Sequence, residues 1–201
     1  EPIFKWHKDH EQYLINREPV AGVGVVWSQR NTDYYGRDDA ANMVDAPYRG
    51  FTQALIRARI PYLPVNAEDL EKEAARLAVL ALPNVAALSD SQCEAVRHFV
   101  QRGGALIATG ASSLYNEWGD ARPDFALADL FGAHAPSVGF GRKEAAQVHS
   151  YLRLTPEMRG RVWGPKAPDE PVATGVRHPV LNGFDETDII PFGGVLESMR
   201  V

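Results

Sequence analysis

The sequence predicts an α/β protein in which helices cover both faces of a parallel sheet. The prediction rests on apolar runs without polar alternation, at residues 20–27, 62–65, 77–82 and 105–109. Such runs are typical of parallel strands that are buried on both sides. Between them, apolar residues recur at helical spacing, and strands that alternate with helices favour βαβ units with right-handed crossovers.

Composition and charge are ordinary for a globular chain. The 201 residues are 45% hydrophobic and 23% charged, which is enough to bury a core. The formal net charge of -5, without blocks of like charge, argues against nucleic-acid binding. No apolar run in the sequence has the ~18 residues of a membrane span. The single cysteine, Cys93, excludes an internal disulfide but does not distinguish a cytoplasmic from an exported protein.

The first residues predict a short amphipathic helix that leads into the fold. Apolar residues at positions 3–15 recur at loosely helical spacing, and Pro19 ends the element. His7 and His10 have a spacing that could hold a metal ion, but a solvated helix face is favoured because no third ligand is nearby. The chain begins with Glu1 instead of methionine, so we expect it to be a segment of a longer protein.

Proline, glycine and capping residues set the limits of the remaining elements. Three helices are expected from these signals: Pro47 to Pro61, Ser89 to residues 103–104, and residues 125–132. Asn66 can cap the acidic turn after the second strand. Cys93 lies on the apolar stripe of its helix, which indicates packing and not nucleophilic chemistry. Further strands are expected at 149–154 and within 188–196.

A long polar loop is predicted after the first strand, over residues 28–46. Loops of this length on compact domains are more often functional than idle. Gly22 and Gly24 do not make a phosphate-binding loop, because they lie before and within the strand and such a loop follows it. The candidate contact residues of this loop are Ser28, Arg30, Asn31, Tyr34, Tyr35 and Arg37.

A second group of candidates follows the strand at residues 105–109. Ligands of open parallel sheets lie outside the carboxyl ends of the strands, where this segment is expected. The candidates are Ser112, Ser113, Tyr115, Asn116 and Glu117. Either serine could be a nucleophile with His134, His149 or His178 as its base. The G-x-S-x-G motif is missing, however, and a hydroxyl that caps the next turn is favoured.

Carboxylates and aromatic rings near the strand ends leave two other functions open. Glu117, Asp120 and Asp124 could form the carboxylate pair of a glycosidase, but solvation or contacts with Arg122 fit them as well. Aromatic side chains could stack on a sugar or on a neighbouring subunit, although packing inside the domain is favoured. These side chains are Trp27, Tyr34, Tyr35, Tyr115 and Trp118, and Arg30, Arg37 and Asn116 would complete a carbohydrate-binding site.

Four segments together resemble a known domain: residues 80–90, 100–104, 109–131 (TGASSLYNEWGDARPDFALADLF) and 178–183 (HPVLNG). They resemble the trimerisation domain of family 42 β-galactosidases, and more closely the version found in glycoside hydrolases with an amylase-like barrel. The resemblance covers roughly residues 20–190. It implies a flavodoxin-like, class I glutamine-amidotransferase-like sheet that follows a catalytic barrel. Residues 1–18 would then be a linker helix from that barrel, and residues 19–201 the domain itself.

An active amidotransferase of this fold has a cysteine at the turn after a central strand and a distant His-x-Glu pair. Here the turn reads GASSL from Gly110 onward, and no histidine has the His-x-Glu spacing. We therefore expect a non-catalytic assembly or interdomain module of a glycoside hydrolase, without a metal or organic cofactor. Its expected partner is another copy or the upstream barrel, and the resemblance implies a trimer. A carbohydrate-binding module and a small serine hydrolase are the alternatives.

Overall fold

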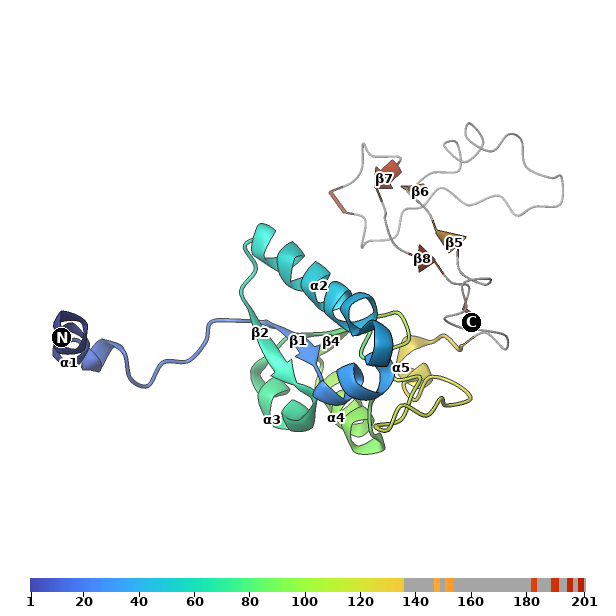
Figure 1. The fold of residues 1–201 in the computed structure, drawn as a ribbon, viewed down its shortest axis with the longest axis horizontal. Coiled ribbons are helices and arrows are strands. Elements are labelled where there is room, and N and C mark those ends of the chain that lie inside the picture. The colour runs from blue at the N-terminus through green and yellow to red at the C-terminus, as the bar shows by residue number, and fades with distance from the viewer. Residues whose placement is uncertain are drawn as a thin grey trace. The chain divides into compact units, whose positions relative to one another are not determined.

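The structure is a computed structural model that describes residues 1–135, 147–148, 151–153, 182–183, 189–191, 195–196 and 199–200 (Figure 1). The chain divides into two compact units, Glu1–Ala135 with Arg200–Val201, and Pro136–Met199. The first unit holds the sheet and every site described below. The predicted division between residues 1–18 and 19–201 stays a prediction.

The first unit is built on a four-stranded parallel sheet with the order β2-β1-β3-β4. The strands are β1 (Val23–Trp27), β2 (Tyr62–Asn66), β3 (Val79–Pro83) and β4 (Ala105–Thr109). From β1 the chain crosses to β2 on one side, and it then returns to β3 on the other side of β1. The order of connection thus reverses between β1 and β3. This confirms the predicted α/β, flavodoxin-like sheet.

Helices lie on both sides of this sheet, as predicted. Figure 1 shows α2 (Ala46–Arg57) on one side, and α3 (Leu70–Glu73) with α4 (Asp90–Gln101) on the other. The Ser89 hydroxyl and the Gln92 side chain form a capping box that begins α4. The short α5 (Ala128–Phe131) ends at Gly132, which has a φ of 60°. The predicted start of α4 and the glycine that ends α5 are confirmed, whereas α2 ends at Arg57, before the expected Pro61, and α5 begins at Ala128, after the expected residue 125.

The hydrophobic core is concentrated on the side of the sheet that α3 and α4 cover. Its fully buried members include Val26, Leu70, Leu80, Leu82, Val96 and Leu127. Cys93 lies within this cluster and is 1% exposed. Burial raises the pKa of its thiol to about 11, so the nucleophilic thiolate is suppressed at neutral pH. The prediction that Cys93 packs in the core is confirmed.

The predicted loop over residues 28–46 is wrong, because most of it is helical. Two turns of π-helix, Asn31–Gly36 and Ala41–Asp45, flank a 3₁₀ turn at Arg37–Asp39, and the second runs into α2. The segment is polar and has no apolar periodicity that would predict a helix. Hydrogen bonds to residues far along the chain, described below, hold it in place.

Two strand predictions also need correction. The apolar run at 105–109 was expected to be buried on both faces, but Ala105, Ile107 and Thr109 of β4 are exposed. Among the described strands β4 pairs with β3 alone, so it is an edge strand of this sheet. The first and third strands also begin later than expected, at Val23 and Val79, because an apolar run does not show where pairing starts.

The N-terminal helix predicted over residues 3–15 is interrupted at His10. It forms α1 (Pro2–Asp9) and a 3₁₀ turn at Glu11–Tyr13, and neither contains a buried residue. His10 stacks on Trp6 with ring centroids 4.5 Å apart, and its Nδ1 lies 2.7 Å from the Trp6 carbonyl oxygen. No helix among the described residues combines the length and the apolar character needed to cross a membrane.

The second unit contains two short antiparallel pairs. One pair joins β5 (Gln147–Val148) to β8 (Val195–Leu196), and the other joins β6 (Tyr151–Arg153) to β7 (Ile189–Pro191). Strands were expected in both regions of the sequence. His149 and His178, two of the three candidate bases, lie outside the described residues.

Candidate functional site

Two asparagines join the carboxyl ends of the strands. Asn31 is 1% exposed; its Oδ1 accepts a 3.0 Å hydrogen bond from the Ala87 N–H, and its Nδ2 donates a 3.0 Å bond to the Asn84 carbonyl. The Asn84 side chain donates to the Met43 carbonyl (2.6 Å) and accepts from the Ala111 N–H (2.7 Å). These amides therefore hold the helical segment after β1 and the turn after β4 against the end of β3.

Sequence reasoning did not single out Asn84 as a residue that joins the strand ends, although one signal was present. The residue follows Pro83 at the end of an apolar run and has a φ of 54°. Asparagine is one of the few side chains that tolerate this left-handed conformation. A Pro-Asn pair that ends a strand could therefore have marked the position.

The hydroxyls of the two candidate serines are hydrogen-bonded to main-chain groups. The Ser112 hydroxyl lies within hydrogen-bond distance of the carbonyls of Leu82 (3.0 Å) and Thr109 (2.8 Å), and it accepts from the Val85 N–H (3.1 Å). The Ser113 hydroxyl accepts from the Leu127 N–H (3.2 Å). The two residues are 1% and 0% exposed. Because a nucleophile must reach its substrate, this geometry favours the structural role and argues against the serine-hydrolase alternative.

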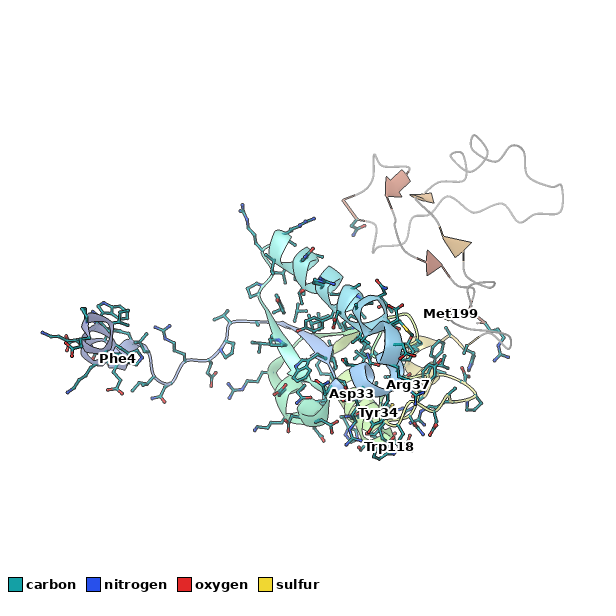
Figure 2. The ribbon with its side chains drawn as sticks, viewed as in Figure 1. Phe4, Asp33, Tyr34, Arg37, Trp118 and Met199 are labelled. Carbon is teal, nitrogen blue, oxygen red and sulfur yellow. The ribbon has the colours of Figure 1, made fainter. Side chains whose placement is uncertain are left out.

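Most of the candidate aromatic residues pack against one another. Tyr34 meets Trp118 edge-on with ring centroids 5.6 Å apart. Figure 2 labels the two residues on the same part of the first unit. The Arg30 guanidinium lies 5.3 Å from the Trp118 ring and donates to Glu68 at 2.9 Å. The rings of Tyr35 and Tyr115 are 5.0 Å apart. Internal packing, the favoured interpretation, thus accounts for these contacts.

The remaining candidates form or flank a compact polar turn. Asn116 Oδ1 accepts from the Trp118 N–H (3.0 Å) and the Asp120 N–H (2.9 Å), which fixes the chain reversal. Glu117 is half-buried in this turn. Arg37, on the other segment, is exposed and has a φ of 37°.

The three candidate carboxylates have different surroundings. Asp120 accepts a 3.1 Å bond from the Asn116 amide, and Asp124 lies 2.6 Å from His134 Nδ1. Arg122, the expected partner, instead binds Asp90 at 2.7 Å. Among the described residues, no group of three or more His, Cys, Asp or Glu side chains could hold a metal ion.

Asp124 fixes residues 134–135, and its replacement tests this role. Its Oδ1 accepts 2.8 Å hydrogen bonds from the Ala135 and Phe125 N–H groups. The Ala135 N–H and then the His134 ring lower the pKa of this carboxyl to about 2. A lowered pKa gives stability that is present above the unfolded pKa of about 3.9 and is lost as the pH falls toward 2.

We expect Asp124→Asn to cost about 1 kcal/mol of unfolding free energy at neutral pH, because the carboxylate is partly solvated. The difference from the parent protein should shrink as the pH falls below the unfolded pKa. Urea unfolding followed by circular dichroism across the acid range measures this. A difference that stays constant with pH would show that the charge of Asp124 is not what stabilises the turn.

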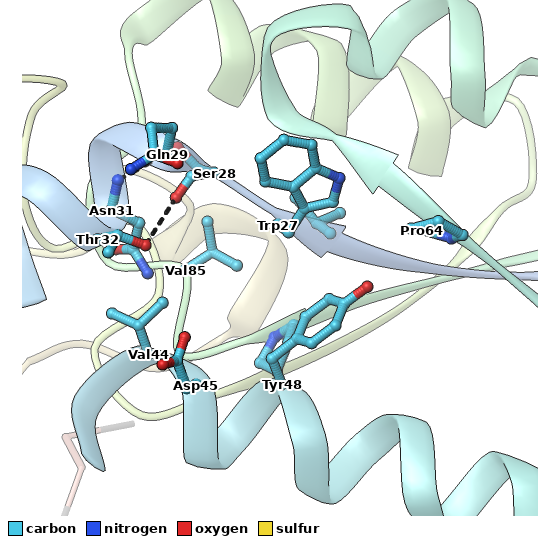
Figure 3. Close-up of a pocket in the computed structure, with 12 residues that line it drawn as sticks. Trp27, Ser28, Gln29, Asn31, Thr32, Val44, Asp45, Tyr48, Pro64 and Val85 are labelled. Carbon is cyan, nitrogen blue, oxygen red and sulfur yellow. Dashed lines mark hydrogen bonds between the residues drawn. The ribbon is translucent and has the colours of Figure 1, made fainter. Parts of the chain in front are cut away.

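A pocket of about 410 Å³ opens at the carboxyl edge of the sheet, where the strand order reverses between β1 and β3 (Figure 3). Ligands of open α/β sheets bind at this kind of position. Its lining combines the candidates Ser28 and Asn31 with Trp27, Asp45 and Tyr48. Ser28 accepts a 3.3 Å bond from the Asn31 N–H and is nearly buried. Sequence reasoning missed Asp45 and Tyr48, because they lie at the start of α2, far along the sequence from the end of β1 that they face.

Comparison with solved structures finds a similar fold in two β-galactosidases. The β-galactosidase from Bifidobacterium adolescentis superposes with a TM-score of 0.51, at 15% identity, over 67% of this chain and 62% of that chain. The β-galactosidase from Bacillus circulans sp. alkalophilus superposes with a TM-score of 0.53, at 17% identity, over 76% of this chain and 21% of that chain. The fold is related to one found in glycoside hydrolases.

The chain spans less than two thirds of either β-galactosidase chain, 62% of one and 21% of the other. At these identities the likeness concerns the fold and not the activity. No protein-family model and no curated protein sequence matches the chain.

Proposed function

We propose that this chain is a non-catalytic module of a glycoside hydrolase-related protein and that it holds copies of that protein together. The fold is like a part of two β-galactosidases, and in one of them that part is 21% of the chain. A module of this size beside a larger remainder is consistent with an assembly role. The expectation of a trimerisation-like, amidotransferase-derived domain belongs to this proposal.

The surroundings of Ser112, Ser113 and Cys93 support a non-catalytic role. The hydroxyls of Ser112 and Ser113 are buried and bound to the backbone. The Cys93 thiol is buried, with its pKa raised to about 11. The sequence also lacks the cysteine at the turn and the His-x-Glu pair that an amidotransferase needs.

The observation that carries the assembly role is an exposed apolar surface at the amino edge of the sheet. Val20, Ile56 and Ile60 are 90%, 61% and 44% exposed. They line a shallow hollow of about 500 Å³ together with Pro61 and Leu63. Exposed apolar residues that gather around one hollow favour an interaction site, because their exposure to water is unfavourable. A second copy of the chain would cover it.

Light scattering on the 201-residue chain over a range of concentrations tests this proposal. We expect a mass of two or more times 22.2 kDa, and a shift to 22.2 kDa in the double variant Ile56→Glu and Ile60→Glu. Gln53→Glu, an exposed position of α2 outside the hollow, adds one negative charge and should leave the mass unchanged. A parent chain that is monomeric at every concentration would overturn self-association.

The non-catalytic part of the proposal has its own test. We expect no turnover of nitrophenyl galactosides, esters or amides by the purified chain. Turnover that Ser112→Ala or Ser113→Ala abolishes, in a variant whose thermal unfolding is unchanged, would show that the chain is a hydrolase.

A further inference from the structure

The pocket at the strand-order reversal has the size and position of a small-molecule site. Its volume of about 410 Å³ falls in the range of roughly 300–1,000 Å³ that is usual for ligand pockets. It lies at the carboxyl edge of the sheet, whereas the apolar hollow is lined by residues before β1, at and beyond the end of α2, and at the start of β2. A ligand in the pocket would therefore leave the proposed contact surface free.

Two aromatic rings from different elements line this pocket. Trp27 is the last residue of β1 and is 41% exposed, and Tyr48 lies in the first turn of α2. Figure 3 shows both rings at the opening, with the Tyr48 hydroxyl directed toward the side where Trp27 and Pro64 lie. Unlike Tyr34 and Trp118, which contact each other, these two rings have no aromatic partner among the described residues.

Three polar groups of the pocket are available to a ligand. Within residues 1–135, no hydrogen bond or ion pair joins the Trp27 indole N–H, the Asp45 carboxylate or the Tyr48 hydroxyl to another group. Burial, and then the neighbouring Tyr62, raise the pKa of Tyr48, so its hydroxyl stays protonated and can donate. The pocket thus offers two donors and one charged acceptor beside two ring faces.

This set of groups discriminates between classes of ligand. Among the described residues that line the pocket, Asp45 is the one charged side chain, so anions such as phosphates and carboxylates are disfavoured. An ammonium ion could use the carboxylate and the rings, but it would leave the phenol donor unpaired. A neutral sugar has an apolar C–H face for a ring, hydroxyl hydrogens for the carboxylate and hydroxyl oxygens for the Tyr48 donor.

We propose that this pocket binds a neutral sugar residue, which stacks on Trp27 and donates hydroxyl hydrogen bonds to Asp45. Tyr48 donates to a hydroxyl oxygen of the same sugar ring. The indole N–H points along the plane of Trp27 and is left to the solvent. The proposal goes beyond the assembly role, and the two stand on different surfaces. It differs from a site built on Tyr34, Tyr35, Tyr115 and Trp118, whose rings already contact one another in pairs.

Isothermal titration of the 201-residue chain with galactose, glucose, lactose and cellobiose tests the site. We expect saturable binding of at least one of them. Asp45→Asn should weaken it about tenfold, because the acceptor of the hydroxyl hydrogen bonds loses its charge. Trp27→Ala should weaken it about tenfold. The matched control Trp118→Ala removes an exposed ring outside the pocket and should change affinity less than about twofold.

Asp45 has no hydrogen-bond partner within residues 1–135, so Asp45→Asn should fold like the parent, and its thermal unfolding checks this. Absence of saturable binding by all four sugars would overturn the proposal, as would equal losses in Trp27→Ala and Trp118→Ala. Binding of choline without binding of any sugar would also overturn it, because the site would then be one for cations. None of these outcomes changes the mass measured by light scattering, so the assembly role fails or stands separately.

Discussion

Replacing Asn31 by alanine should lower the free energy of unfolding by about 3 kcal/mol. The change removes the partners of two main-chain groups, the Ala87 N–H and the Asn84 carbonyl, which the Asn31 amide now binds at 3.0 Å. A buried polar group left without a partner costs about 1–3 kcal/mol. Asn31 is 1% exposed, so water cannot reach these groups without movement of the chain. Urea unfolding followed by circular dichroism gives the midpoint and the slope.

Asn42→Ala is the matched control for this measurement. Asn42 is exposed and its amide donates only to Asp39, at 2.7 Å, so its loss should be below about 0.5 kcal/mol. Asn31→Asp refines the comparison: it keeps the acceptor for Ala87 but loses the donor and places a charge in a buried site. If Asn31→Ala cost no more than Asn42→Ala, the amide would not be what holds the segment after β1.

The sheet and its helices could be predicted because their signals are local. Asn66, whose side chain accepts from the Glu68 N–H at 3.1 Å, and Ser89 both cap the elements that they were expected to cap. The apolar runs locate the strands to within a few residues. They do not show which strand is at an edge, because β4 has the same apolar composition as a central strand and yet exposes Ile107.

The helical turns between β1 and α2 could not be predicted, because long-range contacts hold them. Residues 31–45 are polar and without period, and the Asn84 amide binds the Met43 carbonyl across 41 positions of sequence. The same limit applies to the pocket. Ser28 and Asn31 were predicted from the position of strand ends, but Asp45 and Tyr48 come to face Trp27 only when α2 packs on the sheet.

The turn after β4 gives the second large expected effect, for Gly110→Ala. Gly110 has a φ of 60°, where a side chain costs about 1–2 kcal/mol. A Cβ there would also collide with the Asn84 side-chain amide, which cannot swing away without losing its bonds to Met43 and Ala111. Overpacking of this kind costs about 1–3 kcal/mol, so we expect a total loss of about 3 kcal/mol.

Two other glycines separate the backbone contribution from the collision. Gly103 has a φ of 94° and open space around its Cα, so Gly103→Ala should lose only about 1–2 kcal/mol. Gly50 lies inside α2 with open space, and Gly50→Ala should gain about 0.5–1 kcal/mol. Urea midpoints of the three variants measure the series. If Gly110→Ala lost no more than Gly103→Ala, the Asn84 amide would be free to move, and it would not be the fixed joint between β3 and the turn after β4.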